Sequence, residues 1–424
     1  MESLKKIISF FLFLLLITSY SYTFADDLSI TGESAILIDG DTGQILYEKD
    51  PHKLLYPAST TKIMTGILAI ELGNPEDVIT IDEEVVDRTD GSHIALEPGE
   101  QLTLHDLLRA LLIQSANDSA VAIAKYISGS VESFADLMNK KAEEVGALNT
   151  HFNNPNGLPD ESHQTTAYDL AMMAKYAMKN DTFRSIVKNY TYTIPKTNKK
   201  DEPRHLQSNN RLLYSNEKID VNGKLVPIKY DGIIGIKTGF TNAAQQCLVA
   251  SAVRNGRYLI SVVLKSTGKN IYSDTHKLLD YGFDNFNEIN LSFKNEFIKN
   301  IEIDNGSLNL VAGVTDKNLS TLIPKNSSDK IEKKINLPKT IEAPIKKGAV
   351  LGNIEYFLGG KSIGKVNVVS TVNVEKIPTT KIFTTFIFHN LWILILVLFS
   401  ILLLRKIIKY NKRKRRKRRR NNYL

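Results

Sequence analysis

Cysteine is nearly absent from this chain, and its scarcity excludes several kinds of site. The single cysteine, Cys247, rules out an intrachain disulfide and any metal site built from several cysteines. It lies in the apolar run 246–253, where a lone cysteine is typically a small core residue. The eight histidines show no metal-ligand spacing. The sequence therefore predicts no bound metal and no other cofactor.

Charged residues are absent from one long stretch near the C-terminus. Residues 382–404 contain no Asp, Glu, Lys or Arg and consist mainly of Phe, Leu, Ile and Val. A helix of this length crosses about 30 Å of hydrocarbon, whereas a core helix in a soluble domain would normally carry a polar face. The sequence therefore predicts a transmembrane helix over 382–404.

Acidic residues are absent from the segment that follows. Residues 405–420 carry 12 Lys or Arg, and the positive-inside rule places such a tail (405–424) in the cytoplasm and everything before 382 outside. Without these 12 charges the net charge of +8 becomes −4. The folded part has no basic excess, so the sequence does not indicate nucleic-acid binding.

The N-terminus has the pattern of a secretory signal peptide over residues 1–25. Lys5 and Lys6 precede an apolar run, and Thr23 and Ala25 supply small residues at the −3 and −1 positions. The apolar run is short for a bilayer span, which argues against an uncleaved anchor. We expect cleavage after Ala25 and a single-pass protein of the cell membrane whose folded part lies outside.

A change in composition near Asn285 divides the remaining chain. Residues 26–285 mix helical and strand patterns and are rich in Ala, whereas residues 286–378 hold short alternating apolar runs separated by Lys, Asn and Ser. This predicts an α/β domain over 26–285, followed by a small all-β stalk domain over 286–378.

Local patterns predict several elements of the first domain. Gly40-Asp41-Thr42-Gly43 and Asn255-Gly256 are turn signals, each between two apolar runs, and predict two β-hairpins. Residues 233–237 form a further strand pattern. Helical spacing covers 60–72, 104–114, 120–127 and 167–178. We expect an antiparallel sheet with helices on both faces.

The first motif that carries chemistry is Ser59-Thr60-Thr61-Lys62, at the start of a predicted helix. Residues i and i+3 share a helix face, so the hydroxyl and the amine come together. The positive end of the helix disfavours a cation and pushes Lys62 toward the neutral amine. Lys62 is then able to act as a base for Ser59.

Two further motifs follow in the chain. Ser115-Ala116-Asn117 lies between two predicted helices, where the alternative role is helix capping, with Asp118 as the expected cap. Lys237-Thr238-Gly239 ends a predicted strand, where the alternative is a plain strand terminus. A glycine at that point also lets a ligand approach the backbone closely.

The order of the three motifs on helix, inter-helix loop and strand is far more specific than any one of them. It is the constellation of serine β-lactamases and penicillin-binding enzymes. Over residues 34–286 the chain resembles the low-molecular-weight penicillin-binding proteins of the D-alanyl-D-alanine carboxypeptidase family. Further similar segments are 56–62, 91–100, 154–169 and 235–239. The residues after 286 are similar to the C-terminal domain of that family.

The resemblance implies a β-lactamase/transpeptidase-like α/β fold and a serine-type carboxypeptidase. Such an enzyme removes the terminal D-alanine from peptidoglycan stem pentapeptides and binds β-lactams such as penicillin covalently. Ser59 would form the acyl-enzyme and Lys62 would take its proton. Ser115 would relay a proton to the leaving D-alanine, and Asn117 would hold Lys62 and a substrate amide.

The strand motif has a binding role in this resemblance. Lys237 would supply positive potential, and Thr238 would give a hydroxyl to the terminal carboxylate beside Gly239. The backbone N–H groups of Ser59 and Phe240 would form the oxyanion hole.

Two other functions remain open from the residues alone. A β-lactamase needs a carboxylate that activates the deacylating water, and Asp160 and Glu161 lie in the interval where one would be expected. They also belong to the 154–169 segment, which resembles carboxypeptidases. A catalytically idle scaffold that binds cell wall would be expected to have lost a motif member, and none is lost.

The chain departs from the family at two points. It ends in a predicted spanning helix rather than an amphipathic one. The position of the family's carboxylate-binding Arg, on the strand after Lys-Thr-Gly, is Tyr258, with Arg254 and Arg257 nearby. We expect Thr238, Lys237 and Tyr258 to bind the carboxylate.

Overall fold

The computed structural model describes residues 28–421, so the predicted signal peptide at 1–25 lies outside the described residues. The chain forms two compact units. The first unit extends to Glu288 and also includes Leu322–Asn326. The second unit comprises Ile289–Thr321 and the chain from Ser327 onward.

A five-stranded antiparallel sheet forms the centre of the first unit, in the order β2-β1-β11-β10-β9. Its strands are β1 (Ser34–Asp39), β2 (Ile45–Lys49), β9 (Ile233–Thr241), β10 (Gln245–Arg254) and β11 (Arg257–Ser266). Both predicted hairpins are confirmed. Asn255 and Gly256 have φ of 53° and 80°, as a type I′ turn requires.

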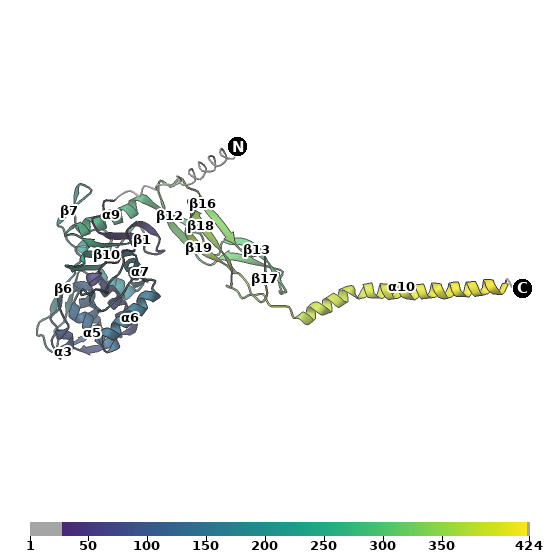
Figure 1. The fold of residues 1–424 in the computed structure, drawn as a ribbon, viewed down its shortest axis with the longest axis horizontal. Helices are drawn as coiled ribbons and strands as arrows, with labels where there is room; N and C mark the ends of the chain where they lie inside the picture. The colour runs from purple at the N-terminus through teal and green to yellow at the C-terminus, as the bar shows by residue number, and fades with distance from the viewer. Residues whose placement is uncertain (1–27, 422–424) are drawn as a thin grey trace, which may run out of the picture. The chain divides into compact units, whose positions relative to one another are not determined.

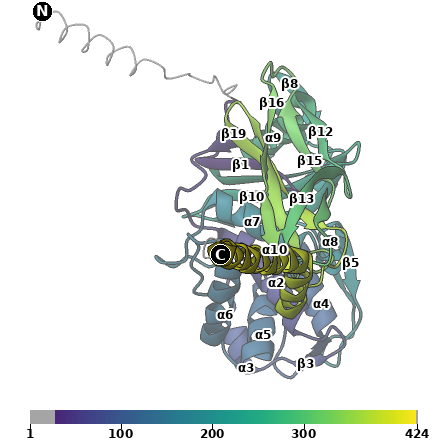
Figure 2. The ribbon, with the colours of Figure 1, turned by 90° about the vertical axis from the view of Figure 1, so that its right-hand side faces the viewer.

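Helices cover both faces of this sheet, as predicted. Alternate side chains of β1 point to opposite faces: Ile36 and Ile38 join one apolar core, and Ala35 and Leu37 join another. The second core is closed by α9 (Asn270–Asn285). Figure 1 shows α9 on one side of β1 and β10, with α5, α6 and α7 on the other, and Figure 2 shows the same order after a 90° turn. The helices of the first face are α2 (Lys62–Leu72), α4 (Leu104–Arg109), α5 (Asn117–Ser128), α6 (Val131–Glu144), α7 (Ala167–Ala177) and α8 (Asp181–Val187).

Short elements connect these helices to the sheet. The helical ones are η1 (Ala58–Thr61), the π-helical turn η2 (Ala110–Gln114), η3 (Arg211–Leu213) and α3 (Glu83–Asp87). The others are three antiparallel strand pairs, namely β3 (Val78–Thr80) with β4 (Gln101–Thr103), β5 (Thr191–Ile194) with β6 (Arg204–Gln207) and β7 (Lys218–Val221) with β8 (Lys224–Pro227). The four predicted helices are confirmed. The polar break before α5 is shorter than expected, because Asn117 is already the first residue of that helix.

The second unit contains the predicted all-β region. Its main sheet has six strands in the order β16-β18-β19-β14-β13-β17 and buries two small apolar cores. The strands β12 and β15 pair with each other outside this sheet, and each contains residues of both units. The strands are β12 (Phe286–Ser292), β13 (Phe297–Asp304), β14 (Leu310–Thr315), β15 (Leu319–Pro324), β16 (Ile331–Asn336), β17 (Thr340–Glu342), β18 (Val350–Leu358) and β19 (Lys361–Ser370).

The C-terminal part of the chain is one long helix, α10 (Thr379–Asn421). Its segment Asn390–Arg416 is long and apolar enough to cross a membrane, with a mean hydropathy of 2.6 in its most apolar window, and none of that window is buried. The predicted apolar helix near the C-terminus is therefore present.

Candidate active site

The turn that carries Ser59 lies directly against β9. Ser59 belongs to η1, immediately before α2. A Cβ added to Gly239 would lie 2.9 Å from the Ser59 backbone nitrogen and 3.1 Å from the carbonyl oxygen of Pro57. Only glycine fits between the strand and the turn at this distance. The fold thus brings the first and third motifs into contact.

Lys62 joins the first motif to the second. Its side chain is fully buried, at 0% exposure. The Lys62 Nζ atom lies 3.1 Å from Ser59 Oγ, 2.6 Å from Asn117 Oδ1 and 2.7 Å from the carbonyl oxygen of Asn156. Burial, followed by the positive charge of Lys237, holds the pKa of Lys62 well below its ordinary value.

These three contacts orient the Lys62 amine in its neutral form, which the lowered pKa favours. A carbonyl or amide oxygen can only accept, so Asn117 Oδ1 and the Asn156 carbonyl each take one N–H of Lys62. A neutral amine has two N–H bonds and one lone pair. In this neutral form the lone pair faces the third neighbour, the hydroxyl of Ser59, whereas in the ammonium form Lys62 donates to Ser59 Oγ. This arrangement suits removal of the Ser59 proton.

The second motif has an unusual backbone. The π-helical turn η2 precedes Ser115, which adopts a left-handed conformation with φ of 66°. Such a conformation costs a non-glycine residue about 1–2 kcal/mol, and strain of this kind concentrates at functional sites. The Ser115 side chain is 4% exposed, and its Oγ makes no hydrogen bond to another residue in the described part of the chain.

The third motif presents both charge and apolar surface. Lys237 is 2% exposed, and its Nζ donates to the carbonyl of Thr238 at 2.9 Å. Burial lowers the pKa of Lys237 to about 7. Thr238 is partly exposed, and Phe240 is 54% exposed at the end of the motif. Gly239 makes the contact with the Ser59 turn described above.

Asp118 does not cap α5, so that prediction was wrong. The N-cap position is Ala116, without a side-chain hydrogen bond. The buried Asp118 carboxylate accepts from the backbone N–H groups of Ile94 and Leu96, at 3.0 and 3.2 Å, and from the Ser119 N–H at 2.8 Å. Asn117 binds the same loop, donating from its backbone N–H to the Ser92 carbonyl and from its side chain to the Asp90 carbonyl. The loop at 90–96 is therefore attached to the second motif.

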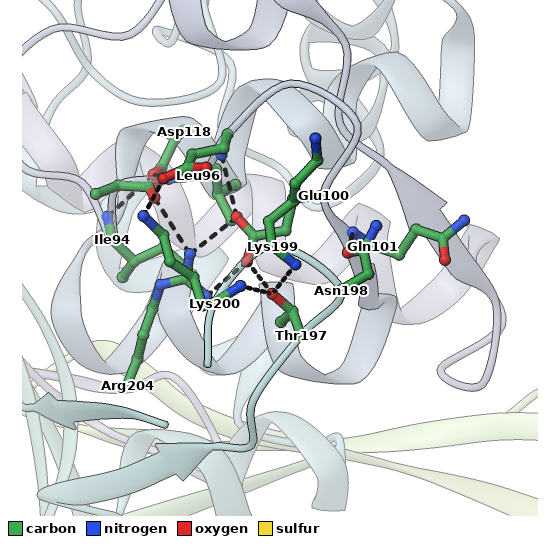
Figure 3. A network of polar contacts seen from close by, with 12 residues as sticks. Ile94, Leu96, Glu100, Gln101, Asp118, Thr197, Asn198, Lys199, Lys200 and Arg204 are labelled. Carbon is green, nitrogen blue, oxygen red and sulfur yellow. Dashed lines mark hydrogen bonds and ion pairs between the residues drawn. The ribbon is translucent and has the colours of Figure 1, made fainter. Parts of the chain in front are cut away.

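The other end of this loop is held by a buried ion pair, shown with its neighbours in Figure 3. Glu100 is 0% exposed, and Arg204 contacts both carboxylate oxygens at 2.8 Å. The hydroxyl of Thr197 donates to the same carboxylate at 2.6 Å, and Asn198 donates to the Gly99 carbonyl. The connection between β5 and β6 thus fixes the loop that supports Asn117.

One segment of the site was not assigned a role from the sequence. The Asn154–Pro159 stretch resembles the family but shows no functional side chain in its sequence, yet its Asn156 carbonyl binds Lys62. Thr65 Oγ1 also donates to the Pro155 carbonyl at 2.6 Å, and a Cβ on Gly157 would lie 1.8 Å from the Ala58 carbonyl oxygen. The closely spaced Asn, Pro and Gly signal a tight turn, but a backbone carbonyl as ligand leaves no mark on residue identity.

Tyr258 lies away from the three motifs, so its predicted contact with a substrate carboxylate was wrong. Tyr258 pairs with Val253 on β10, whereas Lys237 pairs with Val249. Four residues of strand separate the two positions by about 13 Å. Arg257 donates to the backbone carbonyls of Gly282 and Phe286, and Arg254 pairs with Asp280 and Asp284. Both arginines attach α9 to the sheet.

The chain is similar to proteins of known activity along most of its length. Residues 21–268 match the family described as D-alanyl-D-alanine carboxypeptidase, and residues 286–376 match the family described as penicillin-binding protein 5, C-terminal domain.

Among individual proteins, D-alanyl-D-alanine carboxypeptidase DacF of Bacillus subtilis is 34% identical, over 82% of this chain and 87% of that protein. Penicillin-binding protein 5 of Haemophilus influenzae superposes with a TM-score of 0.69 at 29% identity, covering 82% of this chain and 98% of that structure. The Streptomyces K15 DD-transpeptidase superposes with a TM-score of 0.55 at 32% identity, covering 60% and 97%.

Proposed function

Because the chain belongs to the D-alanyl-D-alanine carboxypeptidase family of low-molecular-weight penicillin-binding proteins, we propose that Ser59 is its acylated nucleophile. The activity of the family is that of a serine-type peptidase, and its substrate is peptidoglycan. The observation that carries the assignment is the triple contact of Lys62 with Ser59, Asn117 and the Asn156 carbonyl. In this proposal Ser59 Oγ attacks the carbonyl between the two terminal D-alanines of a stem pentapeptide while its proton passes to Lys62.

The remaining motif residues have distinct roles in the proposed reaction. Collapse of the tetrahedral intermediate breaks the peptide bond, and Ser115 relays the proton from Lys62 to the nitrogen of the departing D-alanine. Water then attacks the ester on Ser59, and the shortened peptide leaves with a free carboxylate. Asn117 keeps Lys62 in place and binds a backbone amide of the substrate.

The strand motif binds the charged end of the substrate in this proposal. The Lys237 amine has a lowered pKa only because it is buried, and a substrate carboxylate nearby would restore its positive charge. The Thr238 hydroxyl binds that carboxylate. Gly239 keeps the strand against the Ser59 turn, where the backbone N–H groups of Ser59 and Phe240 would receive the oxyanion.

A β-lactamase is not favoured by the site. The carboxylate that could activate a deacylating water, Asp160, accepts hydrogen bonds from the Ser162 N–H and the Asn153 side chain within its own loop. Both Asp160 and Glu161 are exposed rather than turned into the buried site. We therefore expect penicillin to acylate Ser59 and the resulting acyl-enzyme to be hydrolysed slowly.

The direct test uses the full-length protein in detergent with a fluorescent penicillin and a D-Ala-D-Ala pentapeptide. The wild type should become labelled and should release free D-alanine. Ser59→Ala should do neither, whereas Ser162→Ala, which alters an exposed serine nearby, should do both. Labelling of the Ser59→Ala protein would overturn the assignment, and rapid turnover of penicillin would favour a β-lactamase.

We further propose that the protein is a single-pass membrane protein with the catalytic unit outside. The support is the apolar segment of α10 and the basic residues that follow it. Residues 1–25 would act as a signal peptide, 286–378 as a stalk, 382–404 as the span and 405–424 as a cytoplasmic tail. Protease added to intact protoplasts should remove the penicillin-binding unit and leave a tag on the tail protected. A protected catalytic unit would contradict this topology.

A further inference from the structure

His163 is a buried histidine beside the site that the proposed reaction does not use. It is 1% exposed and lies in the connection between the Asn153–Gly157 turn and α7. Its Nδ1 lies 3.0 Å from the backbone nitrogen of Asn153, and its Nε2 lies 2.9 Å from Thr61 Oγ1. The ring of Phe152 packs edge-on against it, with centroids 5.5 Å apart. His163 thus bridges two segments that meet only in the folded chain.

The two contacts determine where the proton of His163 lies. A backbone N–H can only donate, so Nδ1 accepts and carries no proton. The neutral ring then has its proton on Nε2 and donates it to Thr61 Oγ1. Burial lowers the pKa of His163 to about 4, with Asp160 raising it and His151 lowering it further. The ring is therefore neutral at physiological pH, in one tautomer.

Each segment that His163 joins contributes to the environment of Lys62. Thr61 immediately precedes Lys62 in the turn that also carries Ser59. Asn153 begins the turn whose Asn156 carbonyl accepts a hydrogen bond from Lys62. The two segments fit closely, because Gly157 has φ of 87° and leaves no room for a Cβ against Ala58. A change in their separation would therefore move the Asn156 carbonyl relative to the amine.

We propose that His163 is a positioning residue for the base of the reaction. As the Nε2–H tautomer, it fixes the distance between Thr61 and Asn153, and so keeps the Asn156 carbonyl on the Lys62 amine with the lone pair directed at Ser59. This inference rests on the proposed role of Lys62 as the base. It predicts that loss of His163 slows the acylation step and leaves the first, non-covalent binding of substrate or penicillin nearly unchanged.

The test compares His163→Leu, which keeps the bulk but neither hydrogen bond, with His163→Gln, which keeps one donor and one acceptor. Stopped-flow acylation of the full-length protein by fluorescent penicillin separates the acylation rate constant from the affinity of the initial complex. We expect His163→Leu to lower the rate constant by about tenfold to a hundredfold, since a misplacement of about 1 Å has effects of this size. The initial affinity should change by less than about threefold, and His163→Gln should recover most of the rate.

A second pair of variants keeps the test decisive if His163→Leu fails to fold. Thr61→Val removes the hydroxyl that accepts from His163, and Thr61→Ser retains it. A slower acylation step in Thr61→Val but not in Thr61→Ser supports the proposal. Folded His163→Leu or Thr61→Val protein that acylates at the wild-type rate would overturn it. Ser59→Ala, measured in the same experiment, separates this proposal from the proposed function. If Ser59→Ala is not labelled while the His163 and Thr61 variants acylate at the wild-type rate, the role of His163 is wrong and the proposed function stands.

Discussion

Replacement of Arg204 by Met should destabilise the first unit strongly, although Arg204 makes none of the contacts described for the three motifs. Arg204 is the charged partner of the fully buried Glu100, with both carboxylate oxygens at 2.8 Å. Methionine keeps much of the side-chain volume but leaves the carboxylate with only the Thr197 hydroxyl and the Glu97 N–H as donors. A buried charge without its counter-charge is the main cost of this change.

The expected magnitude follows from the burial of the pair. Removal of one partner of a buried ion pair costs about 3–5 kcal/mol. The two remaining hydrogen bonds place the Arg204→Met variant at the lower end, near 3 kcal/mol, because they still stabilise the carboxylate by about 1.5–3 kcal/mol each. For a unit of this size, 1 kcal/mol corresponds to about 2–4 °C in melting temperature, so a decrease of about 6–12 °C is expected.

Thermal unfolding of the full-length protein in detergent, followed by circular dichroism and by retained penicillin labelling, measures the effect. Arg184→Met is the matched control, because Arg184 forms an exposed ion pair with Asp181 and should cost less than about 1 kcal/mol. In the double variant Arg204→Met/Glu100→Gln the buried charge is absent, so more than half of the lost stability should return. The reasoning is refuted if Arg204→Met has the same melting temperature as the Arg184→Met control. It is also refuted if the double variant has no higher a melting temperature than Arg204→Met.

The same pair predicts a pH dependence of stability. Burial alone would raise the pKa of Glu100, but hydrogen bonds from Arg204 and Thr197 leave it lowered from its ordinary 4.5. The pair therefore stabilises the wild type above pH 4.5, and this contribution is lost as the pH falls through the lower pKa of the folded state. In Arg204→Met, protonation of Glu100 removes the unpaired buried charge and so stabilises the folded state. The difference in free energy of unfolding between the wild type and Arg204→Met should thus decrease as the pH falls. A difference that increases would contradict the assignment.

Three further predictions concern catalysis on a D-Ala-D-Ala peptide. Lys62→Arg should lose at least about a hundredfold in acylation rate, since a guanidinium is not a base at neutral pH; a folded variant with more than about a tenth of the wild-type rate would exclude Lys62 as the base. The pH profile of kcat/KM should rise with pH as Lys62 loses its proton and becomes able to act as the base. It should fall above about pH 7, because Lys237 then loses the positive charge that attracts the substrate carboxylate. A profile still rising well above pH 7 would show that a charged Lys237 is not required. Arg254→Ala and Arg257→Ala should each change kcat/KM by less than about tenfold, because both side chains bind α9. Thr238→Val should lower kcat/KM more than either of them, and a hundredfold loss in folded Arg257→Ala would contradict the register of β11.

Much of the fold was predictable from local patterns, because those patterns act over a few residues. The hairpin at Asn255-Gly256 forms since these two residues accept positive φ at little cost. Helical spacing located α2 and α7 to within two residues. The β-rich composition after Asn285 and the uncharged run near the C-terminus likewise predicted a β-sheet and an apolar helix, both of which the structure contains.

The three motifs were recognisable in sequence because their chemistry depends on residue type: a hydroxyl, an amine and an amide cannot be exchanged for other groups. The features that surround them were decided by the tertiary structure. Asp118 had the composition of a helix cap, yet the packing of the 90–96 loop gave its carboxylate two backbone donors elsewhere. The position of Tyr258 along its strand predicts a place near the site, and only the pairing of β9, β10 and β11 determines how far it lies from Lys237.

The contacts that orient Lys62 also arise only on folding. The Asn156 carbonyl is a backbone group that every residue has, so no side chain in the sequence announces it as a ligand. His163 lies 102 positions from Thr61, and its tautomer follows from a hydrogen bond to the Asn153 N–H that depends on the shape of one turn. Residue identity thus determined which chemical groups the protein has, and long-range packing decided which of them meet, because distances of about 3 Å between remote segments exist only once the chain has folded.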